Sequence, residues 1–290
     1  MESMVTVGID RRNDTAYAAR VKIGSGRPQI MALVRSDSQH LVDHDLLRDS
    51  ELVFSVPDAE AAVHRFHVDS HDTSEVDLKA RFELAQSLPD DESAFVYDTV
   101  VSDSPHCCLG MVMRRKRLEE LMPLRYPGLY VGAHTGPSRL RAVALGYGYL
   151  GFCRPAGGEF VCLADFADTQ ASLCFVYKGR VIGLGYLGSE YMNTGDVSGL
   201  RRLGIEFKTV VSFQSDGLFE RGVSVPLSRI LITGDNDGRI AEELAGHFTA
   251  QVDHPQINPG FFSDPARSPS RPLGEYLVAL GLTLEEGQIG

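Results

Sequence analysis

The stretch VCLADFADTQASLCFVYKGRVIGLGYL, residues 161–187, predicts three consecutive strands joined by short turns. Its first apolar run ends in Asp165, and a polar turn separates this run from the next. Residues 4–10, MVTVGID, begin a second stretch with the same plan, and Asp10 ends its first apolar run. Asp165 lies about half the chain length after Asp10. This repeat predicts two similar α/β halves.

The composition is that of a globular protein with a large core. With 290 residues, of which 43% are apolar and 23% charged, the chain is long enough for roughly two domains. The net charge of −11 argues against nucleic-acid binding, which needs a basic face. The five cysteines are odd in number and contain no CxxC spacing, which argues against a disulfide framework and against a zinc site.

The sequence carries no sign of a membrane segment. No run approaches the roughly 18 apolar residues that a membrane helix needs. The first residues, MESMVTVGIDRR, lack the apolar core of a signal peptide. We therefore expect a cytoplasmic protein with no direct membrane insertion.

The order of the expected elements divides the chain into a first half, residues 1–158, and a second half, residues 159–290. Residues 60–126 have no counterpart at the equivalent place in the second half, and we interpret them as an inserted α+β subdomain. A smaller subdomain is expected at residues 189–228. Residues 229–233, RILIT, precede a glycine turn and a helix, which is the arrangement that holds ligands at a sheet's edge.

Hydrophobic periodicity predicts the remaining elements. A helix that begins at Ser74 has Leu78, Phe82 and Ala85 at i, i+4 and i+7, which predicts one apolar face. Residues 253–272 are too long for an ordinary connector and are expected to be a surface binding loop or partly mobile. We expect further strands at 15–23, 29–35, 51–56, 64–68, 95–101, 107–113 and 128–133, and further helices at 40–48, 114–122, 137–149, 198–215, 239–248 and 273–284.

Several stretches resemble segments of the actin-like ATPase superfamily, in the family's order. VGIDRRNDTAYAARV at residues 7–21 is similar to its first phosphate segment, and CLADFADTQASLCFVYKGRVI at 162–182 is similar to the second. RILITGDNDGRIAEELAGHF at 229–248 resembles its adenosine-contacting segment, and VFSVPDAEAAVHRFHV at 53–68 resembles the strand that leads into an inserted subdomain. Within the superfamily, the chain resembles the PilM-type proteins of type IV pilus assembly, relatives of FtsA. The resemblance implies a duplicated, ribonuclease H-like α/β fold with an inserted α+β subdomain.

The resemblance also implies a site for ATP with Mg²⁺ between the two halves. Asp10 and Asp165 are the residues placed to hold waters of the magnesium ion. The residues implied in nucleotide binding, if binding is retained, are Asp10, Arg12, Asn13, Thr15, Asp165, Thr169, Gln170 and Gly234.

The sequence departs from the family at glycines that let the backbone approach the phosphates. Arg12, Ala167 and Asp235 stand where the family has glycine. Nearby carboxylates add negative charge where a triphosphate would sit, and each unpaired like-charge contact costs on the order of 1 kcal/mol or more. These changes favour degenerate or absent ATP binding over a working site, although Arg12 alone would suit a new phosphate ligand. The carboxylates are Asp14, Asp168, Asp235 and Asp237.

We therefore expect a scaffold of a type IV pilus or related secretion machine, peripheral to the inner membrane through a partner, rather than an enzyme. The resemblance implies that the partner is a PilN-like inner-membrane protein whose N-terminal peptide docks between the first half and the inserted subdomain. Other pilus or secretion assembly proteins are further expected partners. The implied docking residues are Leu52, Phe54, Val56, Leu78, Phe82 and Ala85.

Two other functions stay open. One is a nucleotide-dependent enzyme of the same superfold, either a slow ATPase or a small-molecule kinase. The other is an actin-fold interaction module from a different cell-envelope system. A metal site made by His64, His67 and His71 with Asp69 and Asp72 is disfavoured, because a strand places the first two histidines on opposite faces.

Overall fold

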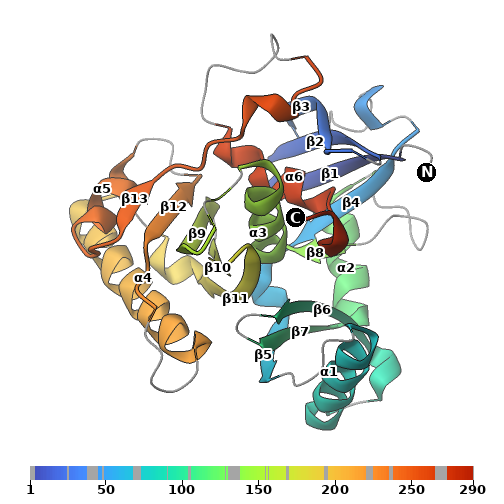
Figure 1. The fold of residues 1–290 in the computed structure, drawn as a ribbon, viewed down its shortest axis with the longest axis horizontal. Coiled ribbons are helices and arrows are strands. Elements are labelled where there is room, and N and C mark those ends of the chain that lie inside the picture. The colour runs from blue at the N-terminus through green and yellow to red at the C-terminus, as the bar shows by residue number, and fades with distance from the viewer. Residues whose placement is uncertain are drawn as a thin grey trace.

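A computed structural model of the chain describes residues 4–24, 26–37, 45–47, 49–67, 73–89, 91–103, 106–127, 129, 138–153, 155, 157–167, 170–192, 195–219, 225–234, 238–264 and 273–289. Within these ranges the chain forms three β-sheets and six α-helices (Figure 1). None of the helices in the described ranges is long and apolar enough to cross a membrane.

The first sheet has five strands in the order β3-β2-β1-β4-β8. Its central strand β1 pairs with β2 in antiparallel and with β4 in parallel orientation. The middle of β1 is buried on both faces, because its five consecutive residues Thr6–Asp10 are all buried and neighbouring residues of a strand point to opposite faces. The strands are β1 (Met4–Arg12), β2 (Thr15–Ile23), β3 (Gln29–Asp37), β4 (Glu51–Val56) and β8 (Ser138–Leu140).

The second sheet repeats this plan with the order β11-β10-β9-β12-β13. Its central strand β9 pairs with β10 in antiparallel and with β12 in parallel orientation, as β1 does with β2 and β4. The predicted duplication of the α/β unit is therefore confirmed in the strand order of the two sheets. The strands are β9 (Phe160–Ala167), β10 (Gln170–Tyr177), β11 (Arg180–Leu187), β12 (Arg229–Thr233) and β13 (Gln251–Asp253).

Two short helices lie in the centre of the molecule between the five-stranded sheets, α3 (Arg141–Phe152) and α6 (Leu277–Leu282) (Figure 1). They cross closely because glycine stands at the contact. A Cβ atom on Gly281 would lie 1.7 Å from the carbonyl oxygen of Ala144 on α3. A Cβ atom on Gly8 of β1 would lie 1.9 Å from the carbonyl oxygen of Ala279 on α6. Backbone therefore packs directly on backbone in this core.

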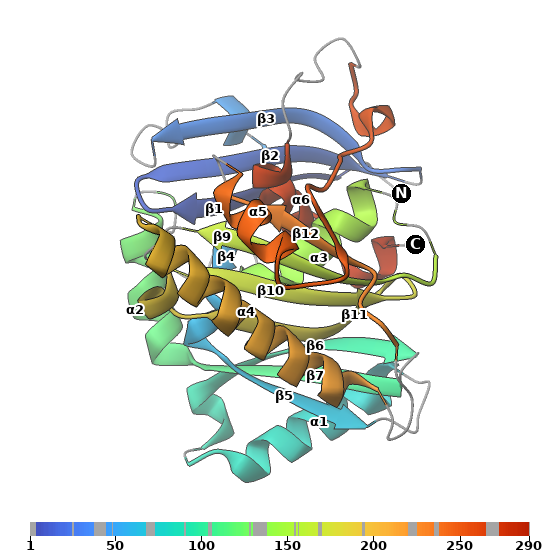
Figure 2. The same ribbon diagram turned by 90° about the vertical axis from the view of Figure 1, so that its left-hand side faces the viewer.

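The third sheet has the order β5-β7-β6 and lies in the segment that the sequence predicts to be inserted. Its strands are β5 (Ala62–His67), β6 (Phe95–Asp103) and β7 (His106–Arg114), and its helices are α1 (Thr73–Ser87) and α2 (Arg115–Arg125). Figure 2 shows these elements stacked below the first sheet, with α1 at the far end. The exact domain bounds stay a prediction.

Helix α1 turns a different face to the core from the one that the sequence predicts. Val76, Ala80 and Leu84, at i, i+4 and i+8, are buried against the third sheet. Leu78 and Phe82 are 69% and 64% exposed. The periodicity predicted that the larger side chains of Leu78 and Phe82 face the core. In the structure α1 packs closely on the sheet through the smaller side chains of Val76 and Ala80.

Two further helices lie beside the second sheet, α4 (Val197–Leu218) and α5 (Arg239–Ala245) (Figure 1). α4 begins at the N-cap Asp196, whose side chain accepts a hydrogen bond from the backbone N–H of Gly199 at 2.6 Å. Leu200, Leu203 and Phe207 bury one face of α4 in the core of the second sheet. The predicted helix at 198–215 is thus confirmed with slightly wider bounds.

Some predicted elements differ from the structure. The expected helix at 137–149 begins later, because Ser138–Leu140 pairs with β4 as strand β8. Most of the expected strand at 128–133, and most of the expected helix at 40–48, lie outside the described residues, although Asp45–Leu47 forms one 3₁₀ turn. The expected final helix is split into the 3₁₀ turn Gly274–Tyr276 and α6. Residues 254–264 contain a 3₁₀ turn at Pro259–Phe261, and 265–272 are outside the described part.

Candidate functional site

The two aspartates that end the apolar runs occupy equivalent positions in the two sheets. Asp10 on β1 pairs with Tyr17 of β2, and Asp165 on β9 pairs with Ser172 of β10, so each lies seven residues before its partner. Both aspartates are fully buried. A buried carboxylate needs hydrogen bonds or a counter-charge, because burial without them is strongly unfavourable.

A hydroxyl group on the next parallel strand supports each aspartate. Ser55 of β4 donates a hydrogen bond from Oγ to Asp10 Oδ1 at 2.7 Å. Thr233 of β12 donates from Oγ1 to Asp165 Oδ1. The hydroxyl of the buried Tyr126 lies 2.8 Å from Ser55 Oγ and holds this side chain in place. The two halves of the site are therefore built alike.

Arg141, the first residue of α3, bridges the two aspartates. Its Nη1 donates a hydrogen bond to Asp10 Oδ1 at 2.6 Å, and its Nη2 donates to Asp165 Oδ2. The Arg141 side chain is 2% exposed. One buried guanidinium thus ties the first sheet to the second.

Arg12, the last residue of β1, makes a second bridge. Its Nε donates to Asp10 Oδ2 at 3.2 Å, and its Nη2 lies 3.0 Å from Asp165 Oδ1. The same Nη2 donates to the carbonyl of Glu275 at 2.9 Å, and the guanidinium lies 4.9 Å from the ring centroid of Tyr17. We call Asp10, Arg12, Arg141 and Asp165 the arginine–aspartate cluster.

The arginine–aspartate cluster combines two arginine and two aspartate side chains, whose formal charges sum to zero. Burial raises the pKa of Asp165, but the guanidinium groups of Arg12 and Arg141 and the hydrogen bond from Thr233 outweigh it, so this pKa lies below its usual range. Burial lowers the pKa of Arg141, and the carboxylates of Asp10 and Asp165 reverse this and raise it. Two positive and two negative groups therefore balance one another inside the core.

Asp58 positions the start of α3, and with it Arg141. It lies in the 3₁₀ turn Asp58–Glu60, directly after β4, and its Oδ1 accepts a hydrogen bond from the backbone N–H of Ala142 at 2.9 Å. Asp58 is 4% exposed, and burial raises its pKa to about 6 although Ser172, Ala142 and Arg141 each lower it. A carboxylate at a helix N-terminus stabilises the helix in two ways, because it accepts a hydrogen bond from a free N–H and interacts favourably with the positive end of the helix dipole.

The structure brings three of the eight predicted nucleotide residues together, namely Asp10, Arg12 and Asp165. Asn13 lies in the exposed turn between β1 and β2 with φ of 48°, and Thr15 follows it at the start of β2. These positions do not contact the cluster through any hydrogen bond or ion pair among the described residues. Their part in nucleotide binding stays a prediction.

The other predicted nucleotide residues lie near the second sheet. Gln170 starts β10 and is buried. Gly234 has φ of 80°, and a Cβ atom there would lie 2.1 Å from the carbonyl oxygen of Phe166, so backbone packing alone requires this glycine. Thr169 lies outside the described residues, as do Asp168, Asp235 and Asp237. Asp14 lies in the described part, where its side chain is 98% exposed and points to solvent.

The predicted partner-binding residues do not form one surface. Phe54 and Val56 are buried within the first sheet and Leu52 is half-buried, whereas Leu78 and Phe82 are exposed and Ala85 is half-buried on α1. In both ribbon views α1 lies at the far end of the third sheet from β4 (Figures 1 and 2). These residues of β4 and of α1 therefore lie at different places in the described part of the fold.

The histidine set that the sequence disfavours as a metal site lies only partly in the described part of the chain. His64 is exposed on β5, where its ring lies beside Phe66. Asp69, His71 and Asp72 lie outside the described residues. Among the described residues no group of three or more His, Cys, Asp or Glu side chains is placed to hold a metal ion.

Sequence reasoning missed Arg141, Ser55, Thr233 and Asp58. The first has a signal that could have found it, because RAVALGYGYL is an apolar helix that begins with one arginine. Arginine is almost never fully buried unless it is paired, so an arginine in such a helix predicts buried carboxylate partners.

No protein-family model matches the sequence, and no curated protein matches it significantly. Solved structures do match. A chain of a PilM–PilN type IV pilus biogenesis complex superimposes with a TM-score of 0.70 at 15% identity, over 98% of this chain and 98% of that one. A protein from Bacteroides thetaiotaomicron with an actin-like ATPase fold and unknown function superimposes with a TM-score of 0.50 at 11% identity, over 97% and 96% of the two chains. The chain therefore has the duplicated actin-like α/β fold that its sequence predicts.

The buried ion pairs of Arg141 lead to a prediction about the stability of the fold. We expect Arg141→Gln to lower the free energy of unfolding by about 3–5 kcal/mol, because it leaves two buried carboxylates with one guanidinium. Urea unfolding followed by circular dichroism measures the change.

Arg117→Gln is the matched control. Arg117 donates two hydrogen bonds to Glu60, at 2.7 and 2.6 Å, but its side chain is 47% exposed. We expect little change in this variant, because exposed ion pairs contribute little to stability. Equal losses in the two variants would contradict a structural role for the arginine–aspartate cluster.

The raised pKa of Asp58 leads to a prediction about how the stability of the fold changes with pH. Between pH 3.8 and about 6 the unfolded chain releases this proton before the folded chain does, so the carboxyl lowers stability as pH rises through that window. Asp58→Asn keeps an oxygen for the Ala142 N–H and has no proton to release. We expect its stability relative to the wild type to rise by about 2–3 kcal/mol between pH 4 and pH 7.

Chemical unfolding of both proteins across this pH range measures the difference. Arg141, Asp165 and Ser172, which also face Asp58, are present in both proteins, so their direct contributions largely cancel. A stability difference that does not change with pH would show that Asp58 ionises in its usual range.

Proposed function

We propose that the chain is an actin-like scaffold of a type IV pilus or related secretion machine, in which ATP binding is weak or lost. The observation that carries this proposal is the arginine–aspartate cluster. Asp10 and Asp165 are the residues whose place in the fold suits the waters of a magnesium ion, and two guanidinium groups lie against them instead.

The residues present do not fit a magnesium-bound nucleotide. Each of the four carboxylate oxygens is already engaged by Arg12, Arg141, Ser55 or Thr233. The two arginines balance the two aspartates, so little negative charge remains to attract a divalent cation. A working site would need Arg141 to leave a buried position in which it is paired with both carboxylates.

The overall similarity to a chain of a PilM–PilN type IV pilus biogenesis complex supports a partner of the PilN kind. The sequence resemblance implies that such a partner is an inner-membrane protein with a short N-terminal cytoplasmic peptide. Such a partner would hold the chain at the cytoplasmic face of the inner membrane. The surface that suits a peptide is the outer face of α1, where Leu78 and Phe82 lie one turn apart and are both exposed. An amphipathic or extended peptide binds such a face without any catalytic residue.

The second candidate is a nucleotide-dependent enzyme of the same superfold, and calorimetry with Mg-ATP separates the two. We expect no saturable heat of binding up to about 1 mM nucleotide, because binding must break the arginine–aspartate cluster. Sub-millimolar binding that disappears in Asp165→Ala would instead establish a working site.

The partner surface is tested with a double variant. We expect Leu78→Asp with Phe82→Asp to abolish binding of the N-terminal peptide of a PilN-like protein from the same genome, because two charges replace the apolar contact. Fluorescence anisotropy of the labelled peptide measures binding. The matched control is Val197→Asp with Ile205→Asp, which places two charges on exposed apolar positions of α4 and should leave binding unchanged. Full binding by the α1 variant would exclude this surface.

A further inference from the structure

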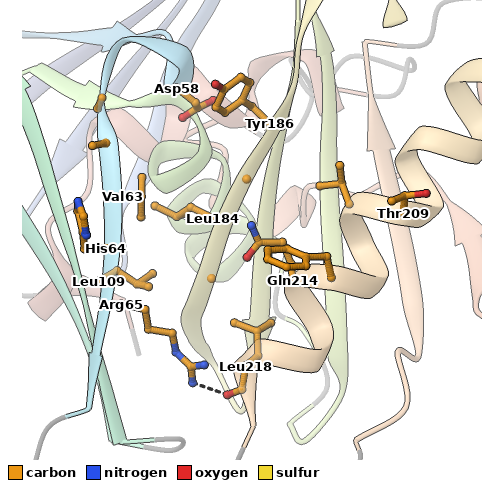
Figure 3. Close-up of a pocket in the computed structure, with 16 residues that line it drawn as sticks. Asp58, Val63, His64, Arg65, Leu109, Leu184, Tyr186, Thr209, Gln214 and Leu218 are labelled. Carbon is orange, nitrogen blue, oxygen red and sulfur yellow. Dashed lines mark hydrogen bonds between the residues drawn. The ribbon is translucent and has the colours of Figure 1, made fainter.

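A groove of about 740 Å³ lies between the third sheet and the second sheet (Figure 3). Ala62–Arg65 of β5 form one wall, Gly183–Tyr186 of β11 form the floor, and one face of α4 forms the other wall. Its size is within the range of sites that bind small molecules or short peptide segments. Apolar side chains dominate the lining, among them Val63, Leu109, Leu184, Val210, Phe213 and Leu218.

Both strands that line the groove are terminal strands of their sheets. Among the described residues, β5 pairs only with β7, and β11 pairs only with β10. A terminal strand directs alternate N–H and C=O groups away from its neighbour, and these groups can pair with an added extended segment. The four residues of β11 along the floor extend for roughly 13 Å at the usual rise of a strand. The groove therefore has the length of four or five extended residues.

Large apolar side chains in this groove are accessible. Phe213 on α4 is 77% exposed, Tyr186 on β11 is 46% exposed and Val63 on β5 is 38% exposed. They come from three different elements, and all three line the same groove. Clustered apolar exposure of this kind marks a binding surface more often than scattered single residues do.

The two ends of the groove carry opposite charges. At one end Asp58 lies beside Tyr186, and at the other end Arg65 lies beside Leu218 (Figure 3). Arg65 donates hydrogen bonds to the carbonyls of Gly217 and Leu218 at the end of α4, so it is already satisfied and closes that end.

Asp58 is satisfied on one oxygen only. Its Oδ1 accepts the N–H of Ala142, whereas its Oδ2 is buried and has no hydrogen-bond partner in the described part of the chain. The nearby hydroxyl of Ser172 lowers the pKa of Asp58. Its geometry does not make a hydrogen bond to Oδ2, and it is itself without a hydrogen-bond partner in the described part of the chain. A buried carboxylate oxygen without a donor is unfavourable by itself and is stabilised by a donor that enters the groove. A positively charged donor is the strongest partner for it.

We propose that this groove binds a short extended segment of a partner protein, with a lysine or arginine side chain paired to Asp58 and apolar side chains at alternate positions beyond it. The segment adds a strand along β11 or β5 and places its apolar side chains against Val63, Leu184 and Phe213. This site goes beyond the proposed function, because it lies between the third and second sheets and shares no residue with the exposed face of α1.

Selection from a phage-displayed library of random heptapeptides on the full chain tests this proposal. We expect the enriched sequences to share one basic residue followed by alternating apolar residues. A labelled synthetic peptide of that sequence should lose affinity roughly tenfold or more for Asp58→Asn, which keeps the contact to α3 and removes the charge. It should lose affinity to a similar extent for Phe213→Asp, whose exposed position leaves the fold intact.

The variant Leu78→Asp with Phe82→Asp is the control, and it should bind the selected peptide with unchanged Kd. This control separates the groove from the α1 surface, so each proposal can fail without the other. Hydrogen exchange should show slower exchange in β11 or β5 when the peptide is bound.

Three outcomes would overturn the proposal. One is the absence of any enriched sequence, and another is enriched peptides whose Kd is the same for Asp58→Asn, Phe213→Asp and the wild type. The third is dimerisation of the chain that Phe213→Asp abolishes, which would assign the groove to a second copy instead of a peptide.

Discussion

The ion pairs of Arg141 with Asp10 and Asp165 hold the two five-stranded sheets in one relative position. Each aspartate lies on the central strand of its sheet, and Arg141 begins the helix that lies between the sheets. A guanidinium in this position is stable only while both carboxylates face it, because a buried charge without a partner is strongly destabilising. Side chains of the chain itself therefore contribute to the fixed geometry between the two halves.

The cluster also reveals how far the two halves have diverged. Ser55 and Thr233 support their aspartates from equivalent strands, so this part of the site is duplicated. Arg12 has no equivalent, since Ala167 lies at the same distance after Asp165. With Arg12 alone the pair of aspartates would carry one unbalanced negative charge. Arg141, which belongs to the connecting helix, supplies the second positive charge and completes the balance.

The sequence predicted the strands well because strand periodicity and turn residues are local. It could not predict the arginine–aspartate cluster, because Arg141 lies 131 residues from Asp10 and 24 from Asp165, and no local pattern joins them. The prediction of which face of α1 is buried was wrong for a related reason. The helix carries apolar side chains on more than one face, so periodicity alone does not choose between the Leu78 face and the Leu84 face. Contact with the third sheet decides which face is buried.

The glycines in the segments that resemble the actin-like family show that a sequence can keep the residues of a fold without keeping the residues that bind its ligand. Gly8 lets the carbonyl of Ala279 approach β1, and Gly234 lets its chain segment pack on the carbonyl of Phe166. Both positions would require glycine whether or not a phosphate lay nearby, because any Cβ atom would overlap backbone. Such glycines therefore indicate how the fold packs and do not indicate a ligand. The side chains that lie in the site are more informative, and here they are the two arginines that pair with Asp10 and Asp165.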